Sequence, residues 1–234
     1  MPSDQPANIQ NGSFFQTWIQ ALTKPRITTY AAMAASPKAK ATTAYLWVFL
    51  CSFAPAVVSM VVSGGELTRR LVEVGVDTEQ LGGGIGSALV NFLCIAPFAA
   101  VAGVVGFLIS AALMQWIGKM FGGLGSFDQL AYALGAITAP ALLVSALLTL
   151  PAAIPFAGLC FAGLSAVFSI YVLALQVMAI KGVHQFGWVP AIGTFIIPGL
   201  AIALLVCCAV VVLLSVTGLA MGDVWNTINQ SLMQ

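Results

Sequence analysis

The amino-acid sequence predicts an all-α membrane protein, a bundle of five transmembrane helices with an amphipathic interfacial helix on its N-terminal side. Two observations predict this fold class. The chain is 60 % hydrophobic and only 6 % charged, whereas soluble domains are roughly 25 % charged. Five apolar runs contain no charged side chain, and each has about the 20 residues that a helix needs to cross a bilayer. These runs are residues 41–62, 85–114, 129–154, 156–180 and 192–217.

The first predicted element is a short helix over about residues 13–24. Ser13 and Gln16 have the spacing of a capping box, in which two side chains bond the first free backbone amides. An aromatic-rich apolar face suits the headgroup boundary of a membrane, and the alternative is a helix packed on the protein's own spans. The face predicted at the membrane interface consists of Phe14, Phe15, Trp18, Ile19 and Leu22.

Basic residues predict the orientation of the spans. Cytoplasmic loops carry an excess of Lys and Arg. If residues 1–40 are cytoplasmic, six of the eight basic residues lie on that side: Lys24, Arg26, Lys38, Lys40, Lys119 and Lys181. Ser36 followed by Pro37 is typical of a helix start, which predicts that the first span begins in an exposed basic turn. The transmembrane domain is then 41–217, and the tail 218–234 lies outside.

Small residues four apart predict how the second, third and fourth spans pack. This spacing lines them up on one helical face, where backbones approach closely. Pro151 and Pro155 bracket a tight hairpin between the third and fourth spans. The predicted packing positions are Ala102, Gly106 and Ser110, then Ala131, Gly135 and Ala139, then Gly158, Ala162 and Ala166.

Residues suited to chemistry are few. His184, the one histidine, follows Lys181 at the end of the fourth span, where a helix C-terminus attracts positive charge; we interpret it as a cap or headgroup contact. The five cysteines lack metal-ligand spacing and are interpreted as packing residues. Gly122-Gly123 lacks the Lys and Ser/Thr of a phosphate loop and is interpreted as a flexible link. We therefore expect no catalytic, metal or cofactor site. A net charge of +1 gives no case for nucleic acid.

Several short motifs together resemble the Yip family of five-span membrane proteins, named for interaction with Ypt/Rab GTPases, and in particular its bacterial members. One motif runs from Gly122 to Gln129, and another ends the fourth span with Lys181-Gly182-Val183-His184. The similarity covers roughly residues 14–216. The positions that carry the resemblance are Gly122, Gly123, Gly125, Ser126, Phe127, Gln129, Pro140, Pro151, Pro155, Lys181 and His184.

The resemblance implies five spans, a cytoplasmic N-terminus, no enzymatic activity, and a scaffold that binds partners or shapes membranes. The chain lacks the longer N-terminal region, with its Asp-Leu-Tyr-Gly-Pro-type segment, of the eukaryotic trafficking members. It also has Pro190 where a basic residue often precedes the alanine at Ala191. These two departures weigh against a GTPase partner.

Three functions compete on these grounds. The leading hypothesis is a non-enzymatic scaffold or accessory subunit that contacts membrane lipids and packs with other integral membrane proteins or with itself. The alternative is a channel or transporter for an uncharged small solute, with Asn91 and Gln176 as its polar path. An intramembrane enzyme is disfavoured, because ionisable residues at membrane depth are usually kept for function and the five runs hold none.

Overall fold

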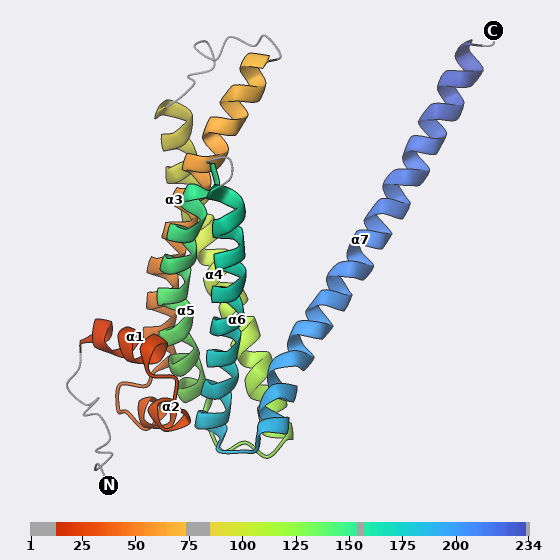
Figure 1. Cartoon of the computed structure of the whole chain (residues 1–234). Coiled ribbons are helices and arrows are strands. Elements are labelled where there is room, and N and C mark those ends of the chain that lie inside the picture. Colours follow the sequence, from red (N-terminus) through yellow and green to blue (C-terminus); the bar gives the residue numbers. More distant parts are fainter. Residues whose placement is uncertain (1–12, 74–84, 154–156, 233–234) are drawn as a thin grey trace. The chain divides into compact units, whose positions relative to one another are not determined.

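The computed structural model of the chain describes residues 13–73, 85–153 and 157–232 (Figure 1). Every regular element among them is a helix. They are α1 (Phe14–Thr23), α2 (Ile27–Ala34), α3 (Ala41–Glu73), α4 (Ile85–Met120), α5 (Phe127–Thr149), the short 3-10 helix η2 (Leu150–Ala153), α6 (Ala157–His184) and α7 (Trp188–Leu232). The chain divides into two compact units, one up to Thr194 and one from Phe195 to Gln234.

Four helices in the described part are long and apolar enough to cross a membrane, which confirms an all-helical protein with membrane-crossing helices. The segments are Ala41–Val58, Ala96–Met120, Phe127–Thr149 and Gly158–His184. The fifth predicted run lies in α7, a helix of 45 residues whose fully described first part, Trp188–Ala201, is apolar. The fifth span therefore stays a prediction.

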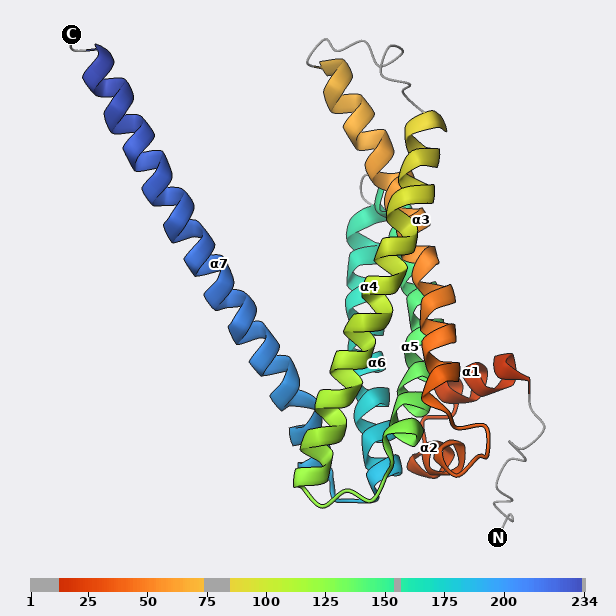
Figure 2. The same cartoon turned by 180° about the vertical axis from the view of Figure 1, so that it is seen from behind.

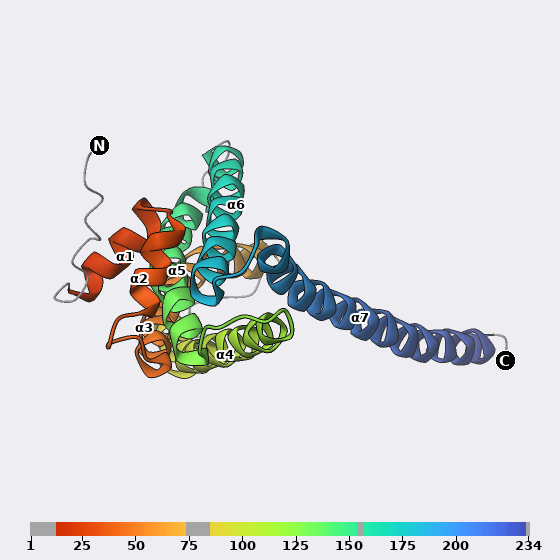
Figure 3. The ribbon, with the colours of Figure 1, turned by 90° about the horizontal axis from the view of Figure 1, so that it is seen from below.

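Helix α5 is the centre of the first unit, and α1, α2, α3, α4 and α6 all pack against it (Figure 3). Of its span, 61 % is buried, compared with 28 % for α3, 17 % for α4 and 6 % for α6. Small residues make this possible. A Cβ placed on Gly135 would lie 2.5 Å from the Cβ of Ala44 in α3, so these two backbones are nearly as close as helices can come.

Three aromatic rings tie α1 to the bundle. The Trp18 ring of α1 meets the Trp47 ring of α3 edge to face, with centroids 5.9 Å apart. Trp47 in turn lies 5.1 Å from the ring of Tyr132 in α5. Such pairs contribute about 0.5–1.5 kcal/mol beyond the area they bury. Packing on the protein's own spans, the alternative given for this helix, therefore does occur on one side of it. Ser13 precedes the helix without a side-chain capping bond, so the predicted capping box is wrong.

Helix α2 fills the corner between α1 and α6, near the end of the bundle where α3 begins (Figures 1 and 2). Tyr30 is fully buried, and its hydroxyl donates to the carbonyl of Ala21 at 2.7 Å. Burial, and then the nearby Tyr171, raise the pKa of Tyr30, so the hydroxyl keeps its proton and remains a donor. A Cβ on Gly182 of α6 would lie 2.8 Å from the carbonyl oxygen of Ile27.

The start of α3 is set by a residue far along the chain. The carboxylate of Asp128, in the first turn of α5, accepts a hydrogen bond from the backbone N–H of Ala41 at 3.0 Å. The predicted start at Ser36 is wrong, because the Ser36 hydroxyl instead accepts from Lys38 N within a turn. One acidic side chain therefore joins the beginnings of two membrane-crossing helices.

Replacing Asp128 with alanine is expected to lower the free energy of unfolding by about 1 kcal/mol, the typical cost of losing a helix cap. Thermal unfolding in detergent micelles measures the change. Asp128→Asn is the matched variant, because its amide oxygen still accepts from Ala41 N and should retain most of the stability. If asparagine costs as much as alanine, the hydrogen bond to Ala41 is not the source of the effect.

Candidate functional site

Two sequence segments that carry the family resemblance meet where α4 and α6 end. His184, the last residue of α6, is 1 % exposed. Its ring lies against Gly118 in the last turn of α4 and against Gly123 in the following loop. The Phe186 ring stacks on it with centroids 5.2 Å apart and an angle of 12°. We name Gly118, Gly123, Gly125, His184 and Phe186 the His184 cluster.

The glycines of the His184 cluster leave no room for side chains. A Cβ on Gly118 would lie 2.7 Å from Nε2 of His184, and a Cβ on Gly123 would lie closer still to Nδ1. A Cβ on Gly125 would collide with Cγ1 of Val183 and lie 2.8 Å from the Val183 carbonyl oxygen. The close approach of three backbone segments therefore requires glycine at all three positions.

Gly122 and Gly123 close the end of α4. Gly122 has a positive φ of 82°, a conformation that favours glycine. The N–H of Gly123 donates to the Gly118 carbonyl at 2.9 Å, and the N–H of Gly122 donates to Lys119 at 3.0 Å. These are the two bonds of a Schellman motif. The interpretation of this pair as a flexible link is wrong, because both residues hold defined hydrogen bonds.

The loop from α4 to α5 is also held by side chains and by α6. The Gln115 amide donates to the Gly125 carbonyl at 2.9 Å. The N–H of Leu124 donates to the carbonyl of His184 at 3.2 Å. Sequence reasoning missed Gln115, whose only signal was an amide just after a long apolar run. The loop joins α4, α5 and α6 at one end of the bundle.

The interpretation of His184 as a cap or headgroup contact is wrong for its side chain. The ring is buried, and neither ring nitrogen has a hydrogen-bond partner within the described part of the chain. The ring acts as a wedge between α4 and the loop, while the backbone carbonyl bonds Leu124. Among the described residues, no group of three or more His, Cys, Asp or Glu side chains gathers to hold a metal ion. Of the described cysteines, Cys51 is buried, while Cys160, Cys207 and Cys208 are exposed.

The other motif positions begin α5 or lie beyond it. Ser126 and Gln129 form a complete capping box, with Gln129 N donating to Ser126 Oγ at 3.3 Å and Ser126 N donating to Gln129 Oε1 at 2.9 Å. The Ser-x-x-Gln spacing signals this box in the sequence, but it went unnoticed there. Phe127 and Pro151 are half-buried, Pro140 is buried inside α5, and Pro155 lies outside the described residues.

The predicted packing positions differ between helices. In α5, Ala131, Gly135 and Ala139 are buried. In α4 and α6, Ala102, Gly106, Ala162 and Ala166 are exposed, and Ser110 and Gly158 are half-buried. No atom of the described residues lies within 4 Å of a Cβ built on Gly106. A different face of α4 packs on α3, because a Cβ built on Gly103 would lie 2.9 Å from the hydroxyl oxygen of Ser52. The predicted positions Ala102, Gly106, Ala162 and Ala166 are therefore not buried within the first compact unit.

The residues of α1 that were predicted to face the membrane interface are partly exposed and partly packed on the bundle. Phe14, Phe15 and Ile19 are each more than half exposed. Trp18 packs on Trp47, and the carbonyl of Leu22 accepts a hydrogen bond from the hydroxyl of Tyr171. Thr17 and Ala21 form the buried side. Helix α1 thus packs on the spans with one side and leaves an apolar side outward, so its interfacial placement stays a prediction.

Polar side chains at membrane depth mostly bond their own helix. The hydroxyls of Ser52, Ser145 and Ser169 donate to carbonyls three or four residues earlier, as Ser and Thr commonly do in helices. Thr149 does the same with Ala146 at 2.8 Å. Gln176 is half-buried, and the side chain of Asn91 lies outside the described ones. The O–H donors of these hydroxyls are thus used within their own helices.

Comparison with known proteins identifies one family. Residues 19–220 match the model of the Yip1 domain, which covers most of the chain and both segments that meet at the His184 cluster. No curated protein and no solved structure matches the chain.

Proposed function

Because this chain belongs to the Yip family of membrane proteins, we propose that it is a non-enzymatic scaffold or accessory subunit in a bacterial plasma membrane. It packs with other integral membrane proteins or with a second copy of itself. Its N-terminus is cytoplasmic and its C-terminus lies outside. It needs no cofactor.

The proposal rests on one observation, which is that predicted packing positions on α4 and α6 are exposed. Ala102 and Gly106 on α4 and Ala162 and Ala166 on α6 are exposed, although small faces are where helices pack in membranes. Lipid needs no such faces. A neighbouring helix does, because close backbone approach gives it van der Waals contact that lipid tails cannot supply.

The exposed side of α1 supports contact with the membrane boundary. Phe14 and Phe15 are 56 % and 57 % exposed, and Lys24 follows at the end of the same helix. Aromatic side chains are enriched at the boundary between lipid and water, and cytoplasmic segments near it are basic. This arrangement anchors the N-terminal segment to the inner leaflet while the aromatic contacts of Trp18 hold it to the bundle.

The transport alternative has less support. A conducting path needs water-facing polar groups through the membrane, whereas the hydroxyls of Ser52, Ser145, Thr149 and Ser169 bond their own helices. Gln176 lies only about 12 Å from the end of α6 by helical rise. One amide near the end of a span is too little for a path.

Association through α4 and α6 is tested by the double variant Gly106→Leu with Ala162→Leu. We expect it to weaken binding to partners or to a second copy about tenfold or more, because the added methylenes hold backbones apart. Stability of the single chain should not change. Gentle-detergent purification, light scattering and mass spectrometry of co-purifying membrane proteins measure the association.

Val105→Leu is the matched control, because Val105 is exposed on α4 next to the small face. If the double variant associates as strongly as the Val105→Leu control, the proposal is contradicted. Flux assays on reconstituted vesicles test the alternative, and saturable flux that Gln176→Leu abolishes would favour transport.

A further inference from the structure

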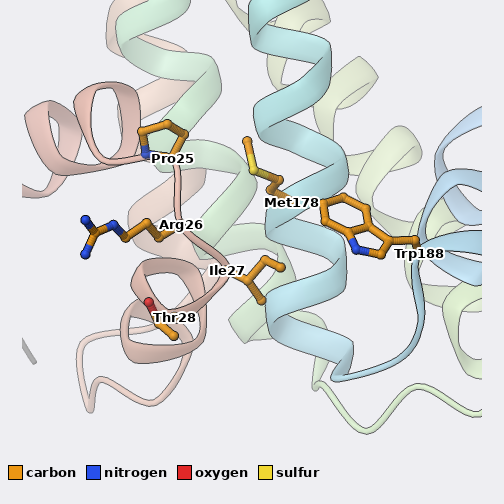
Figure 4. Close-up of a pocket in the computed structure, with 6 residues that line it drawn as sticks. All are labelled: Pro25, Arg26, Ile27, Thr28, Met178 and Trp188. Atoms are coloured by element: carbon orange, nitrogen blue, oxygen red, sulfur yellow. The ribbon is translucent and has the colours of Figure 1, made fainter. Parts of the chain in front are cut away.

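A pocket lies between the link from α1 to α2 and the end of α6 (Figure 4). Its volume is about 610 Å³, and its lining residues are Pro25, Arg26, Ile27, Thr28, Met178 and Trp188. All six belong to the first compact unit. In Figure 4, Ile27 points from the link toward α6, with Met178 and Trp188 beyond it, and Arg26 extends outward on the opposite side. The pocket thus has an apolar floor and a cationic rim.

The position along α6 gives the depth of the pocket in the membrane. Helix α6 runs from Ala157 to His184, about 42 Å at 1.5 Å per residue, which matches a whole bilayer with its headgroups. Met178 is about 9 Å from the end of the helix by the same rise. Headgroup regions take roughly 5–7 Å on each side. The pocket therefore opens where headgroups meet acyl chains.

The charges around the pocket are positive. Lys24 and Arg26 flank Pro25 in the link, and both are exposed. Lys181 lies one turn beyond Met178, with its Nζ 3.9 Å from the centroid of the Trp188 ring. Among side chains that the structure describes, Asp128 is the one acidic group, and its carboxylate bonds Ala41 N at the start of α3. The rim is thus complementary to an anion.

We propose that this pocket binds one anionic phospholipid of the cytoplasmic leaflet. Its phosphate lies near Arg26 at the rim, and the first part of its acyl chains lies along Ile27, Met178 and the Trp188 ring. Lys181 adds positive charge on the Trp188 side of the pocket. Free phosphate would match the charge but leave the apolar floor uncovered, whereas a lipid matches both. The inference rests on the membrane orientation proposed above and is independent of the scaffold role.

Native mass spectrometry of the full chain, released from nanodiscs of equal phosphatidylglycerol and phosphatidylcholine, tests the proposal. We expect one retained phosphatidylglycerol per chain in preference to phosphatidylcholine. Arg26→Gln and Lys181→Gln should each reduce this preference about fivefold, the effect of one basic residue near an anionic surface. Arg26→Lys should keep it. Melting temperatures of all variants show whether a loss of lipid comes from loss of folding.

Lys38→Gln is the matched control, because it removes one exposed positive charge from the N-terminal segment but not from the pocket. It should leave the preference unchanged. If Lys38→Gln and Arg26→Gln lower the preference for phosphatidylglycerol equally, the preference comes from general surface charge and the proposal is overturned. Displacement of the lipid by excess inorganic phosphate would identify a free-anion site and overturn it too. Absence of any preference for phosphatidylglycerol in the unmodified chain, with co-purifying partners intact, would refute the pocket proposal alone.

Discussion

Gly135→Leu is expected to be the most damaging single change in the bundle, with a loss of about 3 kcal/mol or more in the free energy of unfolding. A Cβ at Gly135 would lie 2.5 Å from the Cβ of Ala44 and 3.0 Å from its Cα. Backbone atoms of α3 cannot move away singly, so the whole helix must shift. Helix α5 packs against five other helices, and the shift therefore disturbs the centre of the unit.

Gly106→Leu is the matched control for Gly135→Leu, because it adds the same side chain to a helix glycine with no described atom within 4 Å of its Cβ position. Its effect on the stability of the single chain should stay within about 0.5 kcal/mol. Thermal or denaturant unfolding in mixed micelles compares the two. Equal stabilities would mean that α3 and α5 do not approach at Gly135.

Gly118→Ala is expected to lower the free energy of unfolding when the His184 ring is present and to raise it when the ring is removed. With the ring present, the new methyl group would lie 2.7 Å from Nε2 and 3.1 Å from Cδ2. Gly123 and Phe186 confine the ring, so we expect a loss of about 1–3 kcal/mol. In a His184→Ala background the methyl group meets no ring. Alanine should then stabilise the last turn of α4 by up to about 1 kcal/mol relative to glycine.

A double-mutant cycle on unfolding free energies measures this coupling, which we expect to be about 2 kcal/mol or more. Gly123→Ala provides the control, because its Cβ would also lie 2.8 Å from the backbone carbonyl oxygen of Gly118. Removing the ring does not relieve that contact, so His184→Ala should rescue Gly118→Ala but not Gly123→Ala. Additive effects of Gly118→Ala and His184→Ala would show that the ring does not fill this space.

The parts of the fold that follow from local chemistry were predictable. Long runs without charge predict membrane-crossing helices, because an apolar solvent requires every backbone group to bond within its own segment. The helix before Pro25 and the family resemblance across Gly122–Gln129 and Lys181–His184 were predictable too, and the Yip1 domain match bears the resemblance out. The spacing of Ser126 and Gln129 is the same as that of Ser13 and Gln16, yet only the first pair forms a capping box.

Partners distant in the sequence were not predictable. Asp128 caps α3 across a sequence separation of 87 residues, and Ser36, which has the better local signal, does not. Spacing of four occurs in α4, α5 and α6 alike, yet only the α5 set is buried. In an alanine-rich helix several faces carry small residues, so the pattern indicates that close packing is possible and not which face is used.

The sequence by itself determined that this protein crosses a membrane in apolar helices, because hydrophobicity and charge act residue by residue. Only the tertiary structure decided that α5 is central, that His184 is a buried wedge between glycines, and that Arg26, Met178 and Trp188 line one pocket. Those outcomes depend on which surfaces fit without overlap. Steric fit between helices is a property of pairs of faces, and no local pattern in one helix specifies its partner.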